Sequence, residues 1–158
     1  MDIGHFYFIS DQYYIDFPDG QLMQNKETVN GIPHDRPCFY SFFDNMTGLF
    51  WMIPISSKVQ KFKAIYQNKI QKYGRCDTIV FGEVLGHEKA FLLQNMCPVT
   101  QKYIVSEYID SRANIPVRIS KGLESELAKK ANKVLNLHRQ GVRLIFPDIS
   151  SIEASLSE

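Results

Sequence analysis

The chain has 158 residues, of which 44% are hydrophobic and 13% aromatic, so it has the composition of one globular domain over residues 1–158 rather than of a disordered protein. Its net charge of +1 excludes a generally polybasic or polyacidic protein, but the charges are segregated. Residues 1–36 carry six acids and two bases, whereas residues 58–75 carry six bases and no acid. One basic surface on a near-neutral protein favours local binding of an anionic polymer.

The first half of the chain predicts strands on either side of a long polar segment. Ile3–Ile9 has strand character, and Asp11–Pro33 is polar with turn signals, so we expect a long loop there. The apolar runs Cys38–Phe43 and Leu49–Ile55 flank a loop with a glycine, which predicts a hairpin. Apolar residues at helical spacing predict a helix over Lys58–Tyr73, capped by one of the two preceding serines and ended by a glycine.

The second half predicts a further hairpin and two C-terminal helices. In chain order, the predicted elements are a hairpin of Thr78–Leu85 and Lys89–Gln94 turning at Gly86-His87, a short helix from Thr100 to about Ile109, a strand over Pro116–Ile119, a helix over Leu123–His138 and a last helix capped by Asp148. Short strands with helices between them favour a mainly antiparallel sheet, so we expect an α+β, barrel-like fold.

Neither a membrane segment nor a metal site is expected. The start has no charged n-region and no cleavage site, and no apolar run approaches the roughly 20 residues of a membrane span, which predicts a cytoplasmic protein. Cys38, Cys76 and Cys97 are widely spaced without a CxxC pair, so we predict three core thiols rather than a zinc site. No acidic set is spaced for Mg²⁺ and no nucleotide-binding glycine motif occurs, so we expect no metal and no cofactor.

The segment Ser56-Ser57-Lys58 joins the end of an apolar strand to the start of the basic helix. Two hydroxyls beside free backbone N–H groups at a helix start suit a phosphate, and the lysine adds positive charge. An ordinary N-cap followed by a solvated lysine is the competing explanation of the same residues.

His34 and Arg36 precede the strand at Cys38–Phe43. Arginine suits bidentate contact with phosphate and stabilises charge on a phosphorane, and histidine can move a proton near neutral pH. A surface ion pair and a loop histidine would explain these residues equally. The other three histidines, His5, His87 and His138, have no partners at ligand spacing and are predicted to be structural or solvent-exposed.

The basic helix lacks the acids that exposed helices ordinarily use for i,i+4 pairing. Its cations predict contact with the backbone of a nucleic acid, although a solvated face would show a similar stripe. The predicted RNA-binding residues are Lys61, Lys69, Lys72 and Arg75, with Lys26 as an upstream addition.

Several phrases spread over the chain resemble toxins of type III toxin–antitoxin systems, the ToxN/AbiQ group, and most closely its CptN branch. These phrases are Gly4-His-Phe-Tyr-Phe-Ile9, Leu22-Met-Gln-Asn-Lys26, His34-Asp-Arg-Pro-Cys-Phe-Tyr40, Trp51-Met-Ile-Pro-Ile-Ser-Ser-Lys58, Gln94-Asn-Met-Cys-Pro98 and Leu144-Ile-Phe-Pro-Asp148.

The resemblance implies an SH3-like barrel of the MazF/PemK type with inserted and C-terminal helices. It implies a metal-independent endoribonuclease that cuts A-rich RNA, including its own antitoxin precursor, and that is inhibited by a pseudoknotted RNA. Closed assemblies of two toxins with two RNAs, or three with three, are both compatible with the group. Cellular mRNA would be the other substrate.

Residues and resemblance together predict attack by a ribose 2′-OH on the adjacent phosphate, which needs charge stabilisation and proton transfer but no metal. Arg36 and Lys58 are predicted to stabilise charge, Ser56 and Ser57 to hold the phosphate, and His34 to act as acid or base. In the wider group a proline separates the hydroxyl pair from the lysine, so Lys58, Lys61 or Lys26 could fill the lysine's role. A non-catalytic RNA-binding module is the alternative function.

Overall fold

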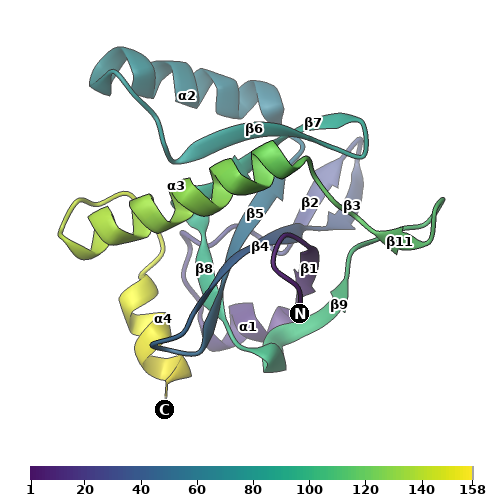
Figure 1. The fold of residues 1–158 in the computed structure, drawn as a ribbon, viewed down its shortest axis with the longest axis horizontal. Coiled ribbons are helices and arrows are strands. Elements are labelled where there is room, and N and C mark those ends of the chain that lie inside the picture. The colour runs from purple at the N-terminus through teal and green to yellow at the C-terminus, as the bar shows by residue number, and fades with distance from the viewer. Residues whose placement is uncertain (158) are drawn as a thin grey trace.

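A computed structural model describes residues 1–157 and shows an α+β fold around one antiparallel sheet (Figure 1). The strand order is β6-β7-β5-β4-β1-β9, and β8 also pairs with β5. The bounds of these strands are β1 Phe6–Ile9, β4 Pro37–Asp44, β5 Leu49–Ser56, β6 Ile79–Val84, β7 His87–Leu92, β8 Cys97–Val99 and β9 Ile104–Glu107. The mainly antiparallel α+β prediction is therefore confirmed.

The long hairpin of β4 and β5 forms the centre of the sheet, as predicted. Seven of the eight β5 residues are buried, because β5 pairs with β4, β7 and β8 and helices pack against its faces. Trp51, Met52 and Ile53 are fully inaccessible and supply side chains to cores on both faces of the sheet. This buried strand ends at Ser56, so its packing fixes where the Ser-Ser-Lys segment lies.

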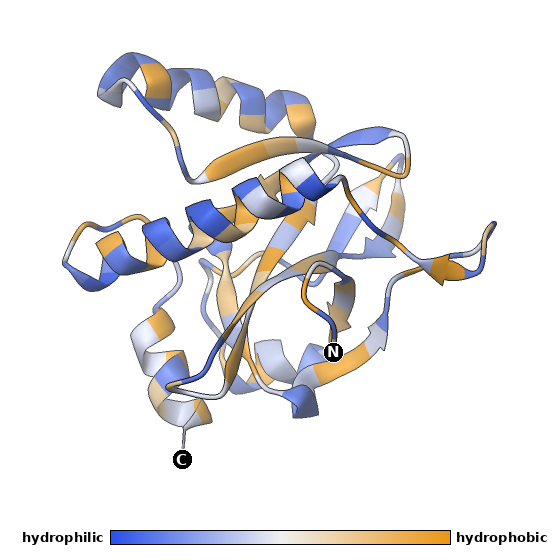
Figure 2. Cartoon of the chain, in the orientation of Figure 1, coloured by the Kyte–Doolittle hydropathy of each residue, from blue (hydrophilic) through white to orange (hydrophobic). Residues whose placement is uncertain are grey.

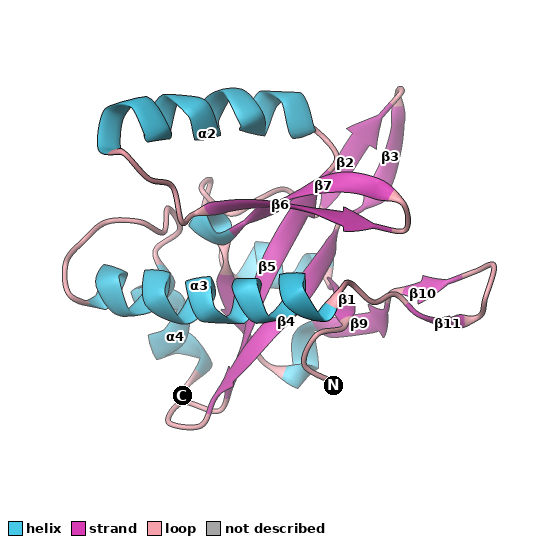
Figure 3. Cartoon of the chain, turned by 45° about the horizontal axis from the view of Figure 1, so that its top comes forward, coloured by secondary structure: helices cyan, strands magenta, loops and turns pink. Residues whose placement is uncertain are grey.

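Within residues 1–157, four α-helices and two 3-10 turns surround the sheet (Figures 1 and 3). Their bounds are α1 Asp11–Asp16, α2 Val59–Tyr73, η1 Leu93–Asn95, η2 Gln101–Tyr103, α3 Lys121–Arg139 and α4 Ile149–Leu156. Helix α3 packs one face of the sheet through Leu127, Ala131 and Val134, whereas α4 contributes Ile152 to the core with Tyr40 and Met52. Helix α2 covers the β6–β7 hairpin with Phe62, and its outward face is mostly hydrophilic (Figure 2).

The prediction of a long loop over Asp11–Pro33 is wrong. The segment contains α1 and most of a hairpin formed by β2 (Lys26–Val29) and β3 (Ile32–Asp35). Asn30 and Gly31, with φ of 52° and 78°, form its turn. Because β3 is entirely exposed, no alternation of buried and exposed residues marks it in the sequence.

The predicted helix from Thr100 to about Ile109 is also wrong. Only the 3-10 turn η2 forms, and the chain then enters β9, which pairs with β1. The β-branched pair Ile104-Val105 suits a strand, and β1 offers an open edge for it. Ile109–Asp110 (β10) and Ile115–Pro116 (β11) then form a small separate hairpin, so the strand predicted at Pro116–Ile119 lies one residue earlier and is shorter.

Several boundaries are confirmed or shifted by one or a few residues. Gly74, with φ of 77°, ends α2, and the side chain of Asp148 caps α4 by accepting from the Ser151 N–H. The β6–β7 turn lies at Leu85-Gly86 instead of Gly86-His87, and the first strand begins at Phe6 rather than Ile3. The N-cap position of α2 is Lys58, not a serine, because Ser56 still belongs to β5.

The three cysteines are free and buried, as predicted for core thiols. Burial raises the pKa of the Cys97 thiol to about 12, so this thiol stays protonated. Among the helices of residues 1–157, none is long and apolar enough to cross a membrane.

Candidate active site

The carboxylate of Glu27 joins the β2–β3 hairpin to the end of β5. Its Oε2 accepts hydrogen bonds from the Ser56 hydroxyl at 2.5 Å and from Arg36 Nη1 at 3.1 Å. Its Oε1 accepts from the Ser57 N–H at 2.8 Å. Glu27, Arg36 and Ser56 are 8%, 5% and 1% exposed, so all three are enclosed by protein.

Two nitrogens of the Arg36 guanidinium, Nε and Nη1, are hydrogen-bonded within the chain. Its Nε donates to the Gln24 carbonyl at 2.7 Å, and Nη1 also donates to the Ile55 carbonyl at 2.8 Å. Burial alone raises the pKa of the Glu27 carboxyl, but the hydrogen bonds from Ser56 and Ser57 and the charge of Arg36 outweigh it and leave that pKa lowered. Glu27 is therefore ionised at neutral pH and paired with the arginine.

An open cavity of about 290 Å³ lies directly beside this buried pair. Six side chains with hydrogen-bonding or acid–base chemistry line it, namely Glu27, His34, Ser57, His87, Lys89 and Tyr108. Apolar walls come from β2, β4, β5 and the β6–β7 turn, and the ring of Tyr108 closes one side. The cavity therefore combines two imidazoles, the Ser57 hydroxyl, the Tyr108 phenol and an ammonium group with the Glu27 carboxylate in one concave surface.

Strand register explains why these residues meet. His34 is directly opposite Glu27 in the β2–β3 hairpin, so both side chains lie on one face of it. On β7, Ala90 pairs with Ser56, so Lys89 lies beside Ser57, and its Nζ donates to the Ser57 Oγ at 2.7 Å. His87 is two residues from Lys89 and shares its face of the strand.

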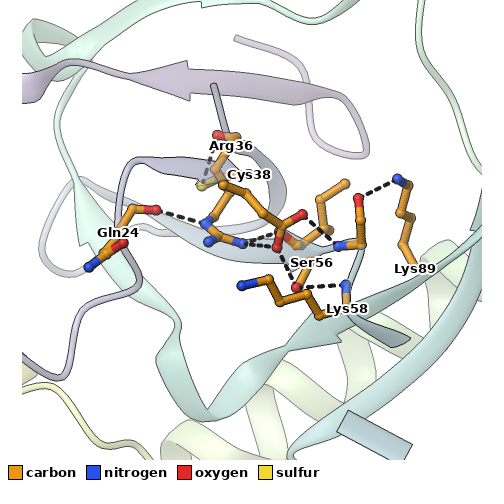
Figure 4. A network of polar contacts seen from close by, with 9 residues as sticks. Gln24, Arg36, Cys38, Ser56, Lys58 and Lys89 are labelled. Carbon is orange, nitrogen blue, oxygen red and sulfur yellow. Dashed lines mark hydrogen bonds and ion pairs between the residues drawn. The ribbon is translucent and has the colours of Figure 1, made fainter. Parts of the chain in front are cut away.

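The predicted catalytic residues fall into three groups. His34 and Ser57 reach the cavity, whereas Ser56 and Arg36 are buried in the network that supports it. Lys58 is exposed and its side chain extends toward Gln24, away from Lys89 on the other side of Ser56 (Figure 4). The Ser56 Oγ instead accepts from the Lys58 N–H at 3.1 Å, so it helps to shape the backbone turn.

The predicted RNA-binding cations are also not equivalent. Lys61 and Lys72 are exposed along α2, and 11 residues of helix separate them by roughly 16 Å. Lys69 is partly buried, and its Nζ donates to the Gln94 side chain at 2.8 Å and to Thr78 at 3.1 Å. Arg75 pairs with Asp77 at 2.7 Å, and Lys26 pairs with Asp35 at 2.8 Å.

Sequence reasoning did not identify Glu27, Lys89 or Tyr108 as site residues, and it did not place His87 in the site. Lys89 and His87 lie in a hairpin some 30 residues beyond Ser57, and no local motif marks them. The alternation of His87 and Lys89 on one strand face was the available signal. No sequence signal marked Glu27 as a site residue, because a single acid in a polar segment ordinarily faces water.

One cluster in residues 1–157 has spacing that would suit a metal ion. Asp2, His5 and Glu107 offer ligand atoms within 4.8 Å of one another. None of the three lines the cavity, and His5 is already bonded to Glu107. Arg118 Nη1 lies 3.1 Å from the other ring nitrogen of His5, so a cation there would face a fixed positive charge.

Replacing Glu27 by glutamine is expected to destabilise the fold by about 3 kcal/mol or more, because it leaves the Arg36 charge buried without a partner. Urea unfolding at pH 7 measures this loss, and Lys26→Gln, which breaks only an exposed pair, should cost less than about 1 kcal/mol. Since the folded-state pKa of Glu27 is lowered, its contribution is complete above the ordinary pKa and is lost as pH falls through the lowered one. Equal stability of Glu27→Gln and the parent protein at pH 7 would contradict this role.

Comparison with known proteins identifies a similar structure but no family from the sequence. No family model matches the chain, and no curated protein matches it in sequence. The structure is similar to that of AbiQ, a lactococcal anti-phage endoribonuclease belonging to the type-III toxin–antitoxin system. The two share 16% identity over 97% of this chain and 95% of that chain, with a TM-score of 0.67. This chain therefore has the fold of AbiQ over nearly its whole length.

Proposed function

We propose that this protein is an endoribonuclease toxin of a type III toxin–antitoxin system. The observation that carries the proposal is the cavity in which His34, Ser57, His87 and Lys89 converge. It occurs on a fold shared with an endoribonuclease of that system. The groups lining the cavity are those that transfer of a phosphodiester to a neighbouring hydroxyl requires.

In the proposed reaction, the ribose 2′-OH attacks the adjacent phosphorus and the bond to the 5′-oxygen breaks. The products are a 2′,3′-cyclic phosphate and a 5′-OH. Negative charge grows on the non-bridging oxygens, where the Lys89 ammonium and the Ser57 hydroxyl donate hydrogen bonds. Lys89 also fixes the Ser57 hydroxyl at 2.7 Å, so both donors are positioned before substrate arrives.

Two imidazoles in one cavity provide both proton transfers. One imidazole accepts the proton of the 2′-OH, and the other gives a proton to the departing 5′-oxygen. His34 comes from the β2–β3 hairpin and His87 from β7, so they approach the cavity from different elements. No metal is needed for this sequence, and we propose a metal-independent enzyme.

Arg36 and Ser56 act as positioning residues in this mechanism. Both hold Glu27, which in turn holds the Ser57 N–H and keeps His34 beside the cavity. Lys58 lies on the other side of Ser56 from Lys89 (Figure 4). Because it is the N-cap residue of α2, we propose that it contacts the RNA backbone together with the exposed cations of that helix. The sequence left open whether Lys58, Lys61 or Lys26 supplies the charge at the cleaved phosphate. We propose that Lys89 supplies it instead.

The finer assignments follow the sequence resemblance. We propose A-rich substrates that include mRNA and the antitoxin precursor, inhibition by a pseudoknotted RNA antitoxin, and a place in the CptN branch. The sheet then corresponds to an SH3-like barrel of the MazF/PemK type, acting in the cytoplasm. Closed assemblies of two toxins with two RNAs, or three with three, remain the two alternatives.

A non-catalytic RNA-binding module is the alternative function. It would use the exposed cations of α2, but it would not require two imidazoles and a lysine-bound serine in one cavity. The experiments below separate the two.

Cleavage of an A-rich RNA is expected to persist in excess EDTA and to leave 2′,3′-cyclic phosphate ends. Gel analysis with and without phosphatase treatment identifies these ends. Expression without antitoxin should arrest bacterial growth, and Ser57→Ala should relieve the arrest while the protein accumulates equally. Binding without cleavage would support the RNA-binding module, and 5′-phosphate ends or a strict Mg²⁺ requirement would rule out the mechanism.

Removing the Lys89 ammonium is expected to slow chemistry, because its interaction strengthens as charge grows in the transition state. We expect Lys89→Met to lower the single-turnover rate on saturated enzyme by about a hundredfold. Lys58→Met is the matched control and should weaken RNA affinity more than it lowers that rate. If Lys58→Met lowers the single-turnover cleavage rate and Lys89→Met leaves it unchanged, Lys58 and not Lys89 stabilises the charge of the transition state.

The exposed cations of α2 are expected to contact phosphates and not bases. Lys61→Gln and Lys72→Gln should each weaken RNA binding and flatten its salt dependence by roughly 0.7 in the slope of log K against log salt. The cut site should not change, since phosphate contacts position RNA without reading sequence. Lys129→Gln on α3 is the control for loss of one exposed charge. An unaltered salt slope in both α2 variants would remove this helix from the RNA interface.

A further inference from the structure

The phenol of Tyr108 is a hydrogen-bond donor in the active-site cavity to which the mechanism above gives no role. Tyr108 directly follows β9 and also lines a second cavity, at the base of the projecting β10–β11 hairpin (Figure 3). In the strand order, β5, β4 and β1 lie between β9 and β7, the strand that carries Lys89. Tyr108 therefore reaches the cavity from a different part of the sheet than Lys89 and Ser57.

Both the backbone and the ring of Tyr108 are held in place. Its N–H donates to the Phe6 carbonyl at 2.8 Å, and its carbonyl accepts from the Val117 N–H at 3.0 Å. The ring packs against Phe6 and Phe8 in edge-to-face geometry, with centroid distances of 6.3 Å and 5.4 Å. A donor fixed in this way needs little reorganisation when a substrate binds or reacts.

The hydroxyl of Tyr108 is not used inside the protein. Tyr13 donates its hydroxyl to the Pro98 carbonyl at 2.8 Å, whereas the Tyr108 hydroxyl has no hydrogen-bond partner in residues 1–157 and is not sealed from solvent. Burial and the charge of Asp110 raise the pKa of Tyr108, so its hydroxyl stays protonated at neutral pH. It is therefore a neutral donor that a ligand of the cavity can use.

The other polar side chains of the cavity leave one side of a bound phosphate without a donor. The Ser57 Oγ and the Lys89 Nζ lie 2.7 Å apart, so they approach the phosphate from the same side. In the proposed mechanism the two imidazoles transfer protons, and the Glu27 carboxylate can only accept hydrogen bonds. Among the residues that line the cavity, Tyr108 is the remaining donor for a non-bridging oxygen on the other side.

We propose that Tyr108 is a further catalytic residue, whose hydroxyl donates a hydrogen bond to the non-bridging phosphate oxygen turned away from Ser57 and Lys89. This inference rests on the proposed function and adds a third donor to the cavity. The hydrogen bond strengthens as negative charge grows on that oxygen, so it stabilises the transition state more than bound RNA. The phenol itself transfers no proton.

Tyr108→Phe removes the hydroxyl and keeps the ring that packs against Phe6 and Phe8. We expect this variant to cleave RNA about a hundredfold more slowly in single turnover on saturated enzyme, with little change in RNA affinity. Tyr66→Phe is the matched control, because Tyr66 is also partly buried and packed edge-to-face against a phenylalanine, Phe81, but lines neither cavity. The control should cleave at the rate of the parent protein.

Sulfur at the cleaved phosphate distinguishes a catalytic hydroxyl from a structural one. Each non-bridging oxygen of that phosphate is replaced in turn, in separate Rp and Sp phosphorothioate substrates, and sulfur accepts hydrogen bonds only weakly. We expect the parent protein to cleave at least one of these substrates more slowly than ordinary RNA. Tyr108→Phe should lose that difference for one substrate, because the hydrogen bond to that atom is already absent.

Two outcomes overturn the inference while the proposed function stands. In the first, Tyr108→Phe cleaves ordinary RNA at the rate of the parent protein. In the second, its rate falls but the effects of sulfur at both positions stay as they are in the parent protein, which would make Tyr108 a structural residue. A parent protein that binds RNA without cleaving it overturns the proposed function, and the inference with it.

Discussion

The architecture of the site depends on one buried ion pair, between Glu27 and Arg36. A carboxylate taken out of water is unfavourable unless its oxygens are satisfied, and here the Ser56 hydroxyl, the Ser57 N–H and the Arg36 guanidinium satisfy them. The two serine donors come from β5 and from the residue that follows it, whereas Glu27 comes from a hairpin outside the main sheet. The pair therefore locks an exposed hairpin onto the buried strand and fixes His34 beside Ser57.

The same arrangement divides the cations by role. Lys89 reaches the cavity from β7 and bonds Ser57, so in the proposed mechanism its charge lies beside the reacting phosphate. Lys61 and Lys72 are exposed along α2, and we propose that they attract the RNA backbone without reading bases. Lys69 is used inside the protein, where it links α2 to Thr78 and Gln94 and lies over the Phe146 ring. A stripe of like charges on one helix thus divides into binding and structural residues.

The cavity beside Glu27 shares a wall with a second cavity of about 470 Å³, because Leu85, His87 and Tyr108 line both. The second cavity is otherwise lined by residues of β10 and of the turn that follows it. This hairpin lies outside the main sheet, so the strands that hold Ser57 and Lys89 do not depend on it.

The sequence by itself determined the α+β class, the β4–β5 and β6–β7 hairpins, the glycine that ends α2 and the aspartate that caps α4. It also singled out His34 and Ser57, which the structure places in the wall of one cavity. These follow from local signals: alternation, helical spacing, glycine turns and hydroxyls at a strand end. The tertiary structure alone decided that Arg36 and Ser56 are buried supports and that Lys89 replaces Lys58 in the cavity. Glu27 was missed for the same reason, because its role comes from strand pairing and burial between segments far apart in the chain, which no local pattern encodes.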